Sequence, residues 1–279
     1  MSEGPRTFSF VDRIHRFEPG VGLRGSFAIP RGLAEFPAAF VVEAIGQLAC
    51  WGAMAESRFE LRPVAGLCAR IEVRGAPSPG EELELEVEQE SLDTEAVSYS
   101  GRALSKGKTL VRLEHAVGPM LPMHEFEDPK RAAARFEDLI SSDPSPGGCA
   151  DRILPTIERT AGDPGHLARA TLRVPHAAPY FSDHFPLRPV YPGTLLMCAK
   201  LELVRALAQE VGGEAGSWPV LEVRDVKMRT FTAPGEELFL EARWKPGLEG
   251  SARVKLTSRN AKRAVGGATV TLGPSPMRP

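Results

Sequence analysis

The hydrophobic positions form two long apolar segments, each followed by segments in which apolar and polar residues alternate. Residues 37–56, PAAFVVEAIGQLACWGAMAE, are apolar on every face after an early proline, which is typical of a helix surrounded by protein. Residues 192–210, PGTLLMCAKLELVRALAQE, open in a similar way. They carry Lys200, Glu202 and Arg205, so we expect the later turns of this helix to meet solvent on one side.

The alternating segments predict antiparallel strands. Leu83, Leu85 and Val87 share one face of residues 81–90, and glutamates occupy the other face, which is the period of two of a half-exposed strand. The same alternation recurs, wholly or in part, in residues 96–104, 109–117, 236–244, 251–258 and 268–272. We therefore expect an α+β fold in which each half is one buried helix wrapped by an antiparallel sheet. Since a lone sheet has exposed edges, the two sheets are expected to pair side by side.

A long internal repeat relates the two halves. PGEELELE begins at Pro79 and PGEELFLE begins at Pro234, an offset of 155 residues. The same offset places further residues on one another: Arg74 on Arg229, Ile71 on Val226, and Pro37 on Pro192. A period of this length exceeds the repeats of solenoids, so it predicts two copies of a whole domain.

The repeat sets the expected domain boundaries. We assign residues 1–122 to the first unit and residues 150–279 to the second. Residues 123–149 between them read as a linker with one short helix, which begins near Pro129 and is followed by the breaking sequence SSDPSPGG.

Composition and charge narrow the class of protein. The chain has 279 residues and a net charge of -2, so no basic field indicates a nucleic-acid or anionic-membrane partner. The N-terminus lacks a signal-peptide core and no later stretch looks apolar over the length of a bilayer crossing, so we expect a cytoplasmic protein. The four cysteines lack C-x-x-C spacing and are too few for a disulfide framework, so free thiols are predicted at Cys50, Cys68, Cys149 and Cys198.

Two segments carry a family resemblance. Residues 180–196, YFSDHFPLRPVYPGTLL, resemble the active-site loop of the 3-hydroxyacyl-(acyl carrier protein) dehydratases, whose motif is histidine, Phe-Pro, two residues, Pro-Val, one residue and Pro-Gly. Residues 36–47, FPAAFVVEAIGQ, resemble the helix of that family, in which an acidic residue is followed four positions later by glutamine. The resemblance implies a double hotdog, in which two tandem hotdog units form a pseudo-dimer. It also implies an active site that takes its histidine from one unit and its acidic residue from the other.

Each half of this chain departs from the family motif at a different position. Cys198 stands fourteen residues after His184, where the motif has a carboxylate, and Ile29 stands 155 residues before His184. Glu43 maps onto Cys198 by the repeat offset. We therefore expect one intact composite site, made of His184 and Glu43, and an inactive mirror site made of Ile29 and Cys198.

The resemblance implies dehydration of a 3-hydroxyacyl thioester, which removes a proton from C2 and expels hydroxide from C3. A neutral imidazole suits His184 to the first step, and burial in the apolar helix favours a protonated Glu43 for the second. Gly193, at a helix N-terminus, can offer its backbone N–H to the thioester oxygen. Gln47, one turn beyond Glu43, can orient the carboxyl group.

The resemblance also implies how the substrate is held. Phe185, Tyr191 and Pro192 are expected to contact it, and the acyl chain is expected in an apolar tunnel beside the two central helices. The thioester would be carried on the phosphopantetheine arm of an acyl carrier protein or of coenzyme A, without a metal or redox cofactor. Arg188, Lys200 and Arg205 could meet the arm's phosphate or an acidic carrier protein, but we expect solvated charges there.

Other motifs indicate no second chemistry. Residues 20–25, GVGLRG, match a dinucleotide-binding pattern, but Pro30 follows too soon for a helix, so a hairpin connection is predicted. The remaining histidines lack metal-ligand spacing. Cys198 has no histidine placed by sequence to activate it, so we expect a buried thiol rather than a nucleophile.

The sequence thus predicts a double-hotdog dehydratase that forms a 2-enoyl thioester in fatty-acid or polyketide-type biosynthesis. Double-bond isomerisation and thioester hydrolysis are the alternatives within enzymes. A silent acyl-binding or scaffold subunit is the alternative from another class, favoured by the incomplete half-sites and by Arg188, where the family often has glycine. Acyl chain length, the carrier, the pathway and any further homo-oligomer are left open.

Overall fold

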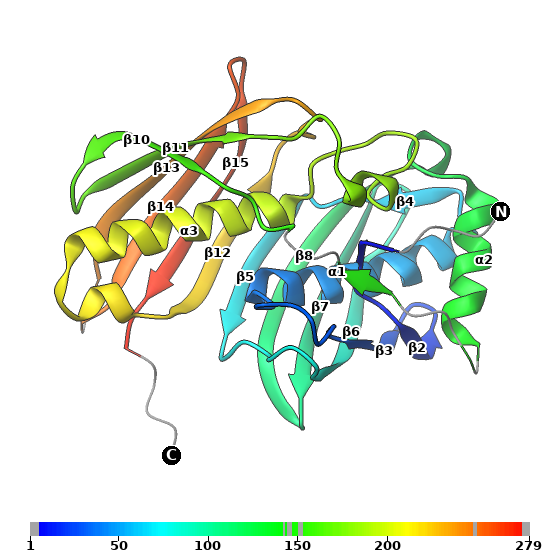
Figure 1. Cartoon of the computed structure of the whole chain (residues 1–279). Helices are drawn as coiled ribbons and strands as arrows, with labels where there is room; N and C mark the ends of the chain where they lie inside the picture. The colour runs from blue at the N-terminus through cyan, green and yellow to red at the C-terminus, as the bar shows by residue number, and fades with distance from the viewer. Residues whose placement is uncertain (1–5, 142, 144–146, 150–152, 248–249, 275–279) are drawn as a thin grey trace.

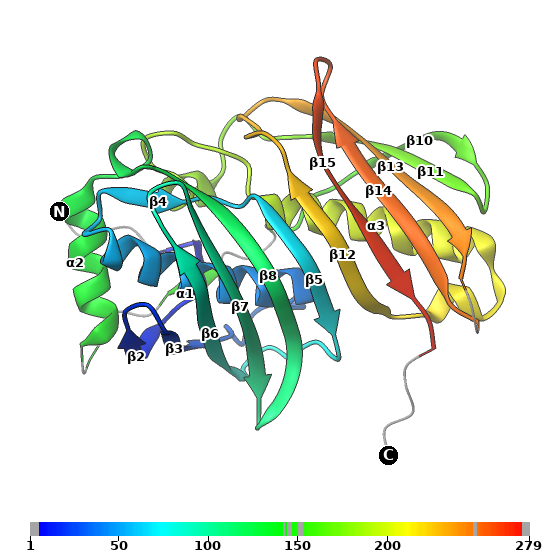
Figure 2. The same ribbon diagram turned by 180° about the vertical axis from the view of Figure 1, so that it is seen from behind.

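Two long helices lie on the same face of one large sheet (Figure 1). They are α1 (Ala38–Glu56) and α3 (Gly193–Val211), one in each half of the chain. Seen from behind, the strands cover both helices (Figure 2). The structure is a computed structural model, and it describes residues 6–141, 143, 147–149, 153–247 and 250–274.

The sheet has thirteen strands, and every pairing in it is antiparallel. The first half contributes β2 (Arg13–Glu18), β3 (Gly22–Ala28), β4 (Leu61–Pro63), β5 (Leu67–Val73), β6 (Glu82–Leu92), β7 (Ala96–Ser105) and β8 (Lys108–Pro122). The second half contributes β10 (Glu158–Asp163), β11 (Leu167–Arg173), β12 (Val220–Met228), β13 (Glu237–Pro246), β14 (Ala252–Arg259) and β15 (Ala264–Leu272). The order is β10-β11-β13-β14-β15-β12-β5-β8-β7-β6-β3-β2, and β4 pairs with β8. The alternating segments of the sequence are therefore strands, as predicted.

The two halves join where β5 pairs with β12. Ile71 lies opposite Val223 in this pairing, and both side chains are buried. The expectation that the two sheets would pair side by side is confirmed. A continuous backbone ladder leaves neither half with an unpaired edge at the centre of the molecule.

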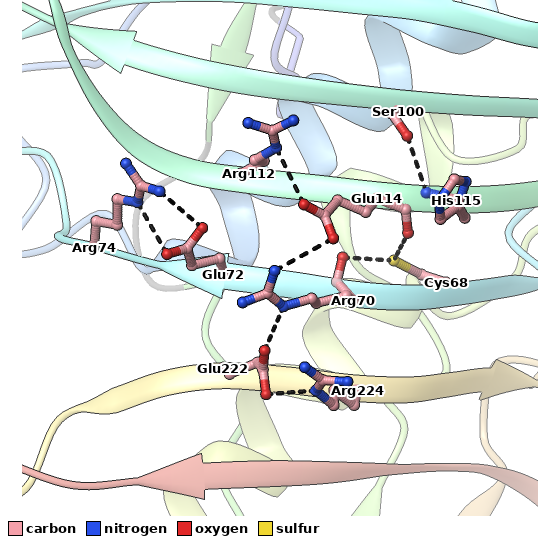
Figure 3. A network of polar contacts seen from close by, with 10 residues as sticks. All are labelled: Cys68, Arg70, Glu72, Arg74, Ser100, Arg112, Glu114, His115, Glu222 and Arg224. Carbon is pink, nitrogen blue, oxygen red and sulfur yellow. Dashed lines mark hydrogen bonds and ion pairs between the residues drawn. The ribbon is translucent and has the colours of Figure 1, made fainter.

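Charged residues alternate in sign across this seam (Figure 3). Arg70 on β5 forms an ion pair with Glu222 on β12, and its Nη1 lies 3.4 Å from Glu114 Oε2 on β8. Glu222 also accepts a hydrogen bond of 2.6 Å from Arg224 Nε. These side chains are partly exposed, so each pair contributes only about 0–1 kcal/mol. The backbone ladder and the apolar residues therefore hold the seam more than the charges do.

The first central helix corrects one expectation. α1 is 19 residues long with a mean hydropathy of 1.4, so by length and composition alone it is apolar enough to cross a membrane. The statement that no stretch reaches that length is therefore wrong. In the structure 56% of this apolar segment is buried, and α1 packs on β3, β6 and β7 as the core helix of its half.

The second central helix is mostly as predicted, with one error. Glu202 and Arg205 are exposed, as expected. Lys200 is only 1% exposed, so its assignment to a solvated face is wrong. The helical period explains the error, because Lys200 follows buried Leu196 by one turn and precedes buried Val204 by another.

The repeat offset of 155 residues does not hold in front of the helices. At the end of β3, Ile29 N donates to Glu81 O at 2.9 Å, and at the end of β11, Val174 N donates to Glu236 O at 2.9 Å. Glu81 and Glu236 are 155 residues apart, so the structural counterpart of Ile29 is Val174. The assignment of Ile29 as the counterpart of His184 is therefore wrong.

The cause is a longer loop in the second half. Residues 29–37 connect β3 to α1, whereas residues 174–192 connect β11 to α3. The second loop contains the 3-10 helix η2 (Pro179–Ser182) and, after it, His184. The first half has no matching segment, because its loop is ten residues shorter.

The linker contains the short helix that was predicted. After the 3-10 helix η1 (Met123–Glu125) comes α2 (Pro129–Ile140), with Pro129 in its first turn. Asp128 caps it by accepting a hydrogen bond of 2.9 Å from Lys130 N. Part of the predicted break, residues 142 and 144–146, lies outside the described residues.

Further details complete the fold. β2 and β3 form a hairpin, as predicted, but its connection is residues 19–21, and residues 22–25 belong to β3. The 3-10 helix η3 (Gly213–Ser217) follows α3. The short strands β1 (Phe8–Ser9) and β9 (Gly148–Cys149) pair with each other, so the start of the described chain is tied to the end of the linker. All four cysteines are free thiols, as predicted.

Candidate active site

A cavity of about 2210 Å³ is lined by residues of both halves. It is larger than the about 300–1,000 Å³ of common small-molecule sites. Its wall includes both central helices and these predicted site residues: Glu43, Gln47, His184, Phe185, Tyr191, Gly193 and Cys198. Pro192 and Ile29 are not part of the wall, because Pro192 is the buried N-cap residue of α3 and Ile29 is buried at the end of β3.

Glu43 projects from the second turn of α1 and is held at both carboxylate oxygens. Gln47 Nε2 donates to Oε1 at 3.0 Å, which is the contact expected of a residue one turn further along the helix. Thr194 Oγ1 donates to Oε2 at 2.6 Å. Thr194 lies in the first turn of α3, so this second hydrogen bond crosses from one half of the chain to the other.

Thr194 was not predicted from the sequence. A threonine next to Gly193 at the start of a helix is common as a local capping residue, and nothing in its neighbourhood points to Glu43. Only the packing of α3 beside α1 brings its hydroxyl to the carboxylate.

His184 lies in the long loop between η2 and α3, where aromatic rings surround it. Its ring stacks on Phe185 with centroids 4.3 Å apart, and the Phe8 ring meets it edge-on at 5.5 Å. Its backbone N–H donates to Tyr180 O at 2.8 Å. The Nδ1 atom is buried and has no hydrogen-bond partner among the described residues.

The surroundings of His184 favour its neutral form. Burial lowers the pKa of His184 below the ordinary value of 6.5, the charge of Glu43 opposes this, and the charge of Arg62 lowers it further. The imidazole is therefore unprotonated at neutral pH. The influence of Glu43 also places the two groups in each other's electrostatic range, as the predicted composite site requires.

Arg62 on β4 reaches the loop that carries His184 from the first half. Its guanidinium carbon lies 4.4 Å from the centre of the Phe185 ring, and its Nη1 lies 2.7 Å from Glu127 Oε2. The side chain is half-buried in the cavity wall. Burial is the main cause of the low pKa of His184, and the charge of Arg62 lowers that pKa further.

The linker also contacts the loop that carries His184 through a hydrogen bond and an ion pair. Leu187 N donates to Phe126 O at 2.9 Å, and Arg188 Nη1 lies 2.7 Å from Glu125 Oε2. The guanidinium of Arg188 lies 4.9 Å from the Phe231 ring centre. Arg188 is exposed, as expected of a solvated charge, and it is also paired with Glu125 and stacked on Phe231.

Gly193 is the first residue of α3, and Pro192 before it offers no side-chain cap. The first N–H groups of a helix have no partner within the helix, so they can serve a ligand. A Cβ at Gly193 would lie 3.0 Å from Met228 Cε, at the flexible end of that side chain, so a small residue fits here with little adjustment.

Cys198 lies on α3 in the cavity wall and is half-buried rather than fully buried as expected. Burial raises the pKa of its thiol to about 12, so the group is protonated at neutral pH and is a poor nucleophile. Its place on α3 matches that of Glu43 on α1, as the repeat predicted. Since the first half lacks the long loop, no histidine faces it in the manner of His184. Across the described part of the chain, no three His, Cys, Asp or Glu side chains gather as a metal site requires.

Comparison with known proteins gives three findings. A family model described as ApeI-like, ApeI dehydratase, matches residues 160–268. The 3-hydroxyacyl-(acyl-carrier-protein) dehydratase FabZ of Thioalkalivibrio sulfidiphilus is 30% identical over 114 residues, which cover 38% of this chain and 76% of that protein. The FabZ of Sodalis glossinidius is 27% identical over 94 residues, which cover 33% of this chain and only 62% of that protein.

Structural likeness extends over nearly the whole chain. The 12:0-ACP thioesterase of Umbellularia californica has a TM-score of 0.56 at 12% identity, and the match covers 91% of this chain and 94% of that one. At this identity the likeness concerns the fold alone. The architecture is the double hotdog, two tandem units that share one sheet and form a pseudo-dimer.

Proposed function

Because this chain belongs to the family of hotdog-fold dehydratases that includes ApeI and FabZ, we propose that it converts a 3-hydroxyacyl thioester to the trans-2-enoyl thioester. The reaction takes place at one composite site between the two halves, which correspond to residues 1–122 and 150–279. The observation that carries this proposal is the convergence of a neutral His184 and a doubly hydrogen-bonded Glu43 on one cavity.

His184 is the base in this reaction. It takes the proton from C2, and the electron pair of that C–H bond forms the C2–C3 double bond. Glu43, in its protonated form, gives its proton to the hydroxyl group on C3, so the C3–O bond breaks and water leaves. One proton then passes back from His184 to Glu43, directly or through water, and both groups return to their starting forms.

The two partners of Glu43 are compatible with an acid. Gln47 keeps donating to Oε1 while Oε2 carries the proton. The Thr194 hydroxyl donates to Oε2 of the carboxylate, and when Oε2 is protonated the hydroxyl can rotate and accept a hydrogen bond from it, because a hydroxyl is both donor and acceptor. The negative charge that develops on the thioester oxygen is met by the N–H groups at the start of α3, with Gly193 first.

The substrate is a thioester on an acyl carrier protein or on coenzyme A. The FabZ relatives are 3-hydroxyacyl-(acyl-carrier-protein) dehydratases, which favours the carrier-protein form. The cavity volume leaves room for an acyl chain together with the end of a phosphopantetheine arm, beside the two central helices.

Thioester hydrolysis is the second candidate. The fold is shared with an acyl-carrier-protein thioesterase over most of the chain, and Glu43 as a carboxylate could activate water. The same thioester distinguishes the two reactions, since dehydration produces enoyl absorbance and hydrolysis releases a free thiol. Thiol release without enoyl formation would replace the first proposal by the second.

The test uses purified protein and a panel of 3-hydroxyacyl thioesters. His184→Ala and Glu43→Gln should each lower turnover by about 100-fold or more, since a general acid or base contributes on that order. Cys198→Ala, on the same cavity wall, should leave turnover nearly intact and serves as the matched control. Tight thioester binding without turnover, unchanged by His184→Ala, would instead indicate a silent acyl-binding subunit.

A further inference from the structure

The first described residues form a strap across the site, which we define as residues 7–10. Phe8 and Ser9 within it are strand β1, held against β9 at the end of the linker. Phe8 is 2% exposed and Phe10 is fully buried. The strap is therefore a fixed part of the wall rather than a loose terminal segment.

One end of the strap is fastened beside the acid. Gln47 Oε1 accepts a hydrogen bond of 2.8 Å from Phe10 N, and Gln47 Nε2 lies 3.3 Å from Phe8 O. The same amide donates to Glu43. Gln47 therefore serves the strap and the carboxyl group at once.

The other end of the strap is fastened beside the base, by Asp183. Its Oδ2 accepts hydrogen bonds from Thr7 N at 2.5 Å, from Phe8 N at 2.9 Å and from Thr7 Oγ1 at 3.2 Å. Hydrogen bonds from backbone amides to an ionised carboxylate are about twice as strong as neutral ones. Asp183 directly precedes His184, so the anchor and the imidazole share one short piece of the loop.

The strap places the aromatic ring of Phe8 against the imidazole of His184. With Phe8 bound at its backbone N–H, its ring lies edge-on to the imidazole at 5.5 Å, in addition to the stacking contact from Phe185. The Phe8 ring also lies 6.3 Å from Tyr180 and 6.2 Å from Phe40. Without the strap, water would reach one side of the imidazole.

We propose that Asp183 is a positioning residue, which anchors the strap so that Phe8 covers His184 and keeps water from it. This role rests on the proposed function only in taking His184 as the base. It adds a residue that the family motif and the acid–base pair leave without a task.

The charged groups around His184 make the test discriminating. Glu43 on α1 and Arg62 on β4 act on the charge of His184, and Asp183 directly precedes it in the loop, whereas residues 7–10 of the strap carry no charge. Removing the negative charge of Asp183 would by itself lower the pKa of His184, because a nearby anion favours the imidazolium. Hydration of the ring would raise that pKa. The two effects have opposite signs.

The experiment follows the titration of the His184 ring by NMR in the full chain without substrate, with the signal assigned through His184→Ala. We expect Asp183→Ala to raise the pKa of His184 toward the ordinary 6.5, through hydration of the ring. Asp183→Asn keeps an oxygen acceptor for the strap while removing the same charge, so it should give no rise. Phe8→Ala, which leaves Asp183 in place, should reproduce the rise.

The matched control is Asp93→Ala. Asp93 also accepts two backbone hydrogen bonds, from Glu95 N at 2.7 Å and Ala96 N at 2.9 Å, but it lies in the turn between β6 and β7. The Asp93→Ala variant should leave the titration of His184 unchanged. If Asp183→Ala does not fold, Phe8→Ala and Asp183→Asn decide the matter alone.

The proposal is overturned if Asp183→Ala leaves or lowers the pKa of His184, if Asp183→Asn raises it as much as alanine does, or if Phe8→Ala has no effect. The titration needs no turnover. A protein that fails to dehydrate any thioester can therefore still support the role of Asp183, so the two proposals fail separately.

Discussion

Thr194 and Gln47 hold the two oxygens of Glu43 from different halves of the chain. Gln47 could be found from the sequence because it is one helical turn from Glu43 on the same helix. Thr194 is 151 residues away, and its contact depends on how α3 lies beside α1. Local periodicity therefore finds one partner of the carboxyl group and misses the other.

Thr194→Val should lower kcat by about 10-fold or more. Valine has nearly the same shape but lacks the hydroxyl, which can donate to the carboxylate that forms as Glu43 gives up its proton. A hydrogen bond to a charged group contributes about 1.5–3 kcal/mol. Steady-state kinetics on the best thioester of the panel measures the effect. Thr194→Ser keeps the hydroxyl and should stay close to the unaltered protein; equal rates for valine and threonine would show that this hydrogen bond does not matter.

At the scale of the element, α3 carries a buried cation. Lys200 is 1% exposed, and no hydrogen bond or ion pair joins its ammonium group to another described residue. Burial lowers the pKa of Lys200 to about 8 from the ordinary 10.5. Below pH 8 the ammonium is charged in both the folded and unfolded states, so the folded state bears the full cost of burying it and the protein is destabilised.

Lys200→Met should therefore raise the free energy of unfolding at pH 7 by about 1–3 kcal/mol, because it removes the buried charge. Between pH 8 and 10.5 the folded protein loses its proton first, so the cost fades and the advantage of methionine should shrink. Chemical denaturation at pH 7 and pH 10 measures both values. Arg205→Met, on the exposed side of the same helix, should change stability by less than about 0.5 kcal/mol. A destabilised Lys200→Met at pH 7 would contradict the expectation.

At the scale of the whole molecule, the two halves share a fold but not a loop. Equivalent backbone hydrogen bonds show that Val174 is the structural counterpart of Ile29. The second loop is ten residues longer and contains Asp183 and His184. The asymmetry is therefore an insertion rather than a substitution of the histidine. It places His184 and Glu43, the proposed base and acid, in one cavity that both halves line.

One binding site per chain follows from this asymmetry. Calorimetric titration with an uncleavable analogue, a thioether carrying the same acyl chain, should give one equivalent per 279-residue chain. His184→Ala should keep that stoichiometry, since it alters the chemistry and leaves the cavity in place. Two equivalents per chain would mean that the half-site at Cys198 binds substrate as well.

Much of the fold follows from the sequence alone. Periods of two and 3.6 place the strands and both central helices, because the face of an element that is apolar is the face that it buries. The repeat identifies two units and shows that Cys198 is at the position equivalent to Glu43. The loop motif identifies His184. These features depend on residues that are close together in the sequence or that are related by its internal repeat.

The tertiary structure decided the rest. The mismatch of Ile29, the burial of Lys200, the bond from Thr194 to Glu43 and the anchoring of the strap by Asp183 all depend on which distant segments meet. A side chain's partner across a seam is set by strand pairing and helix packing, which join residues that no local pattern relates. The sequence alone therefore determined the elements and the proposed reacting pair, whereas the packing determined what surrounds that pair.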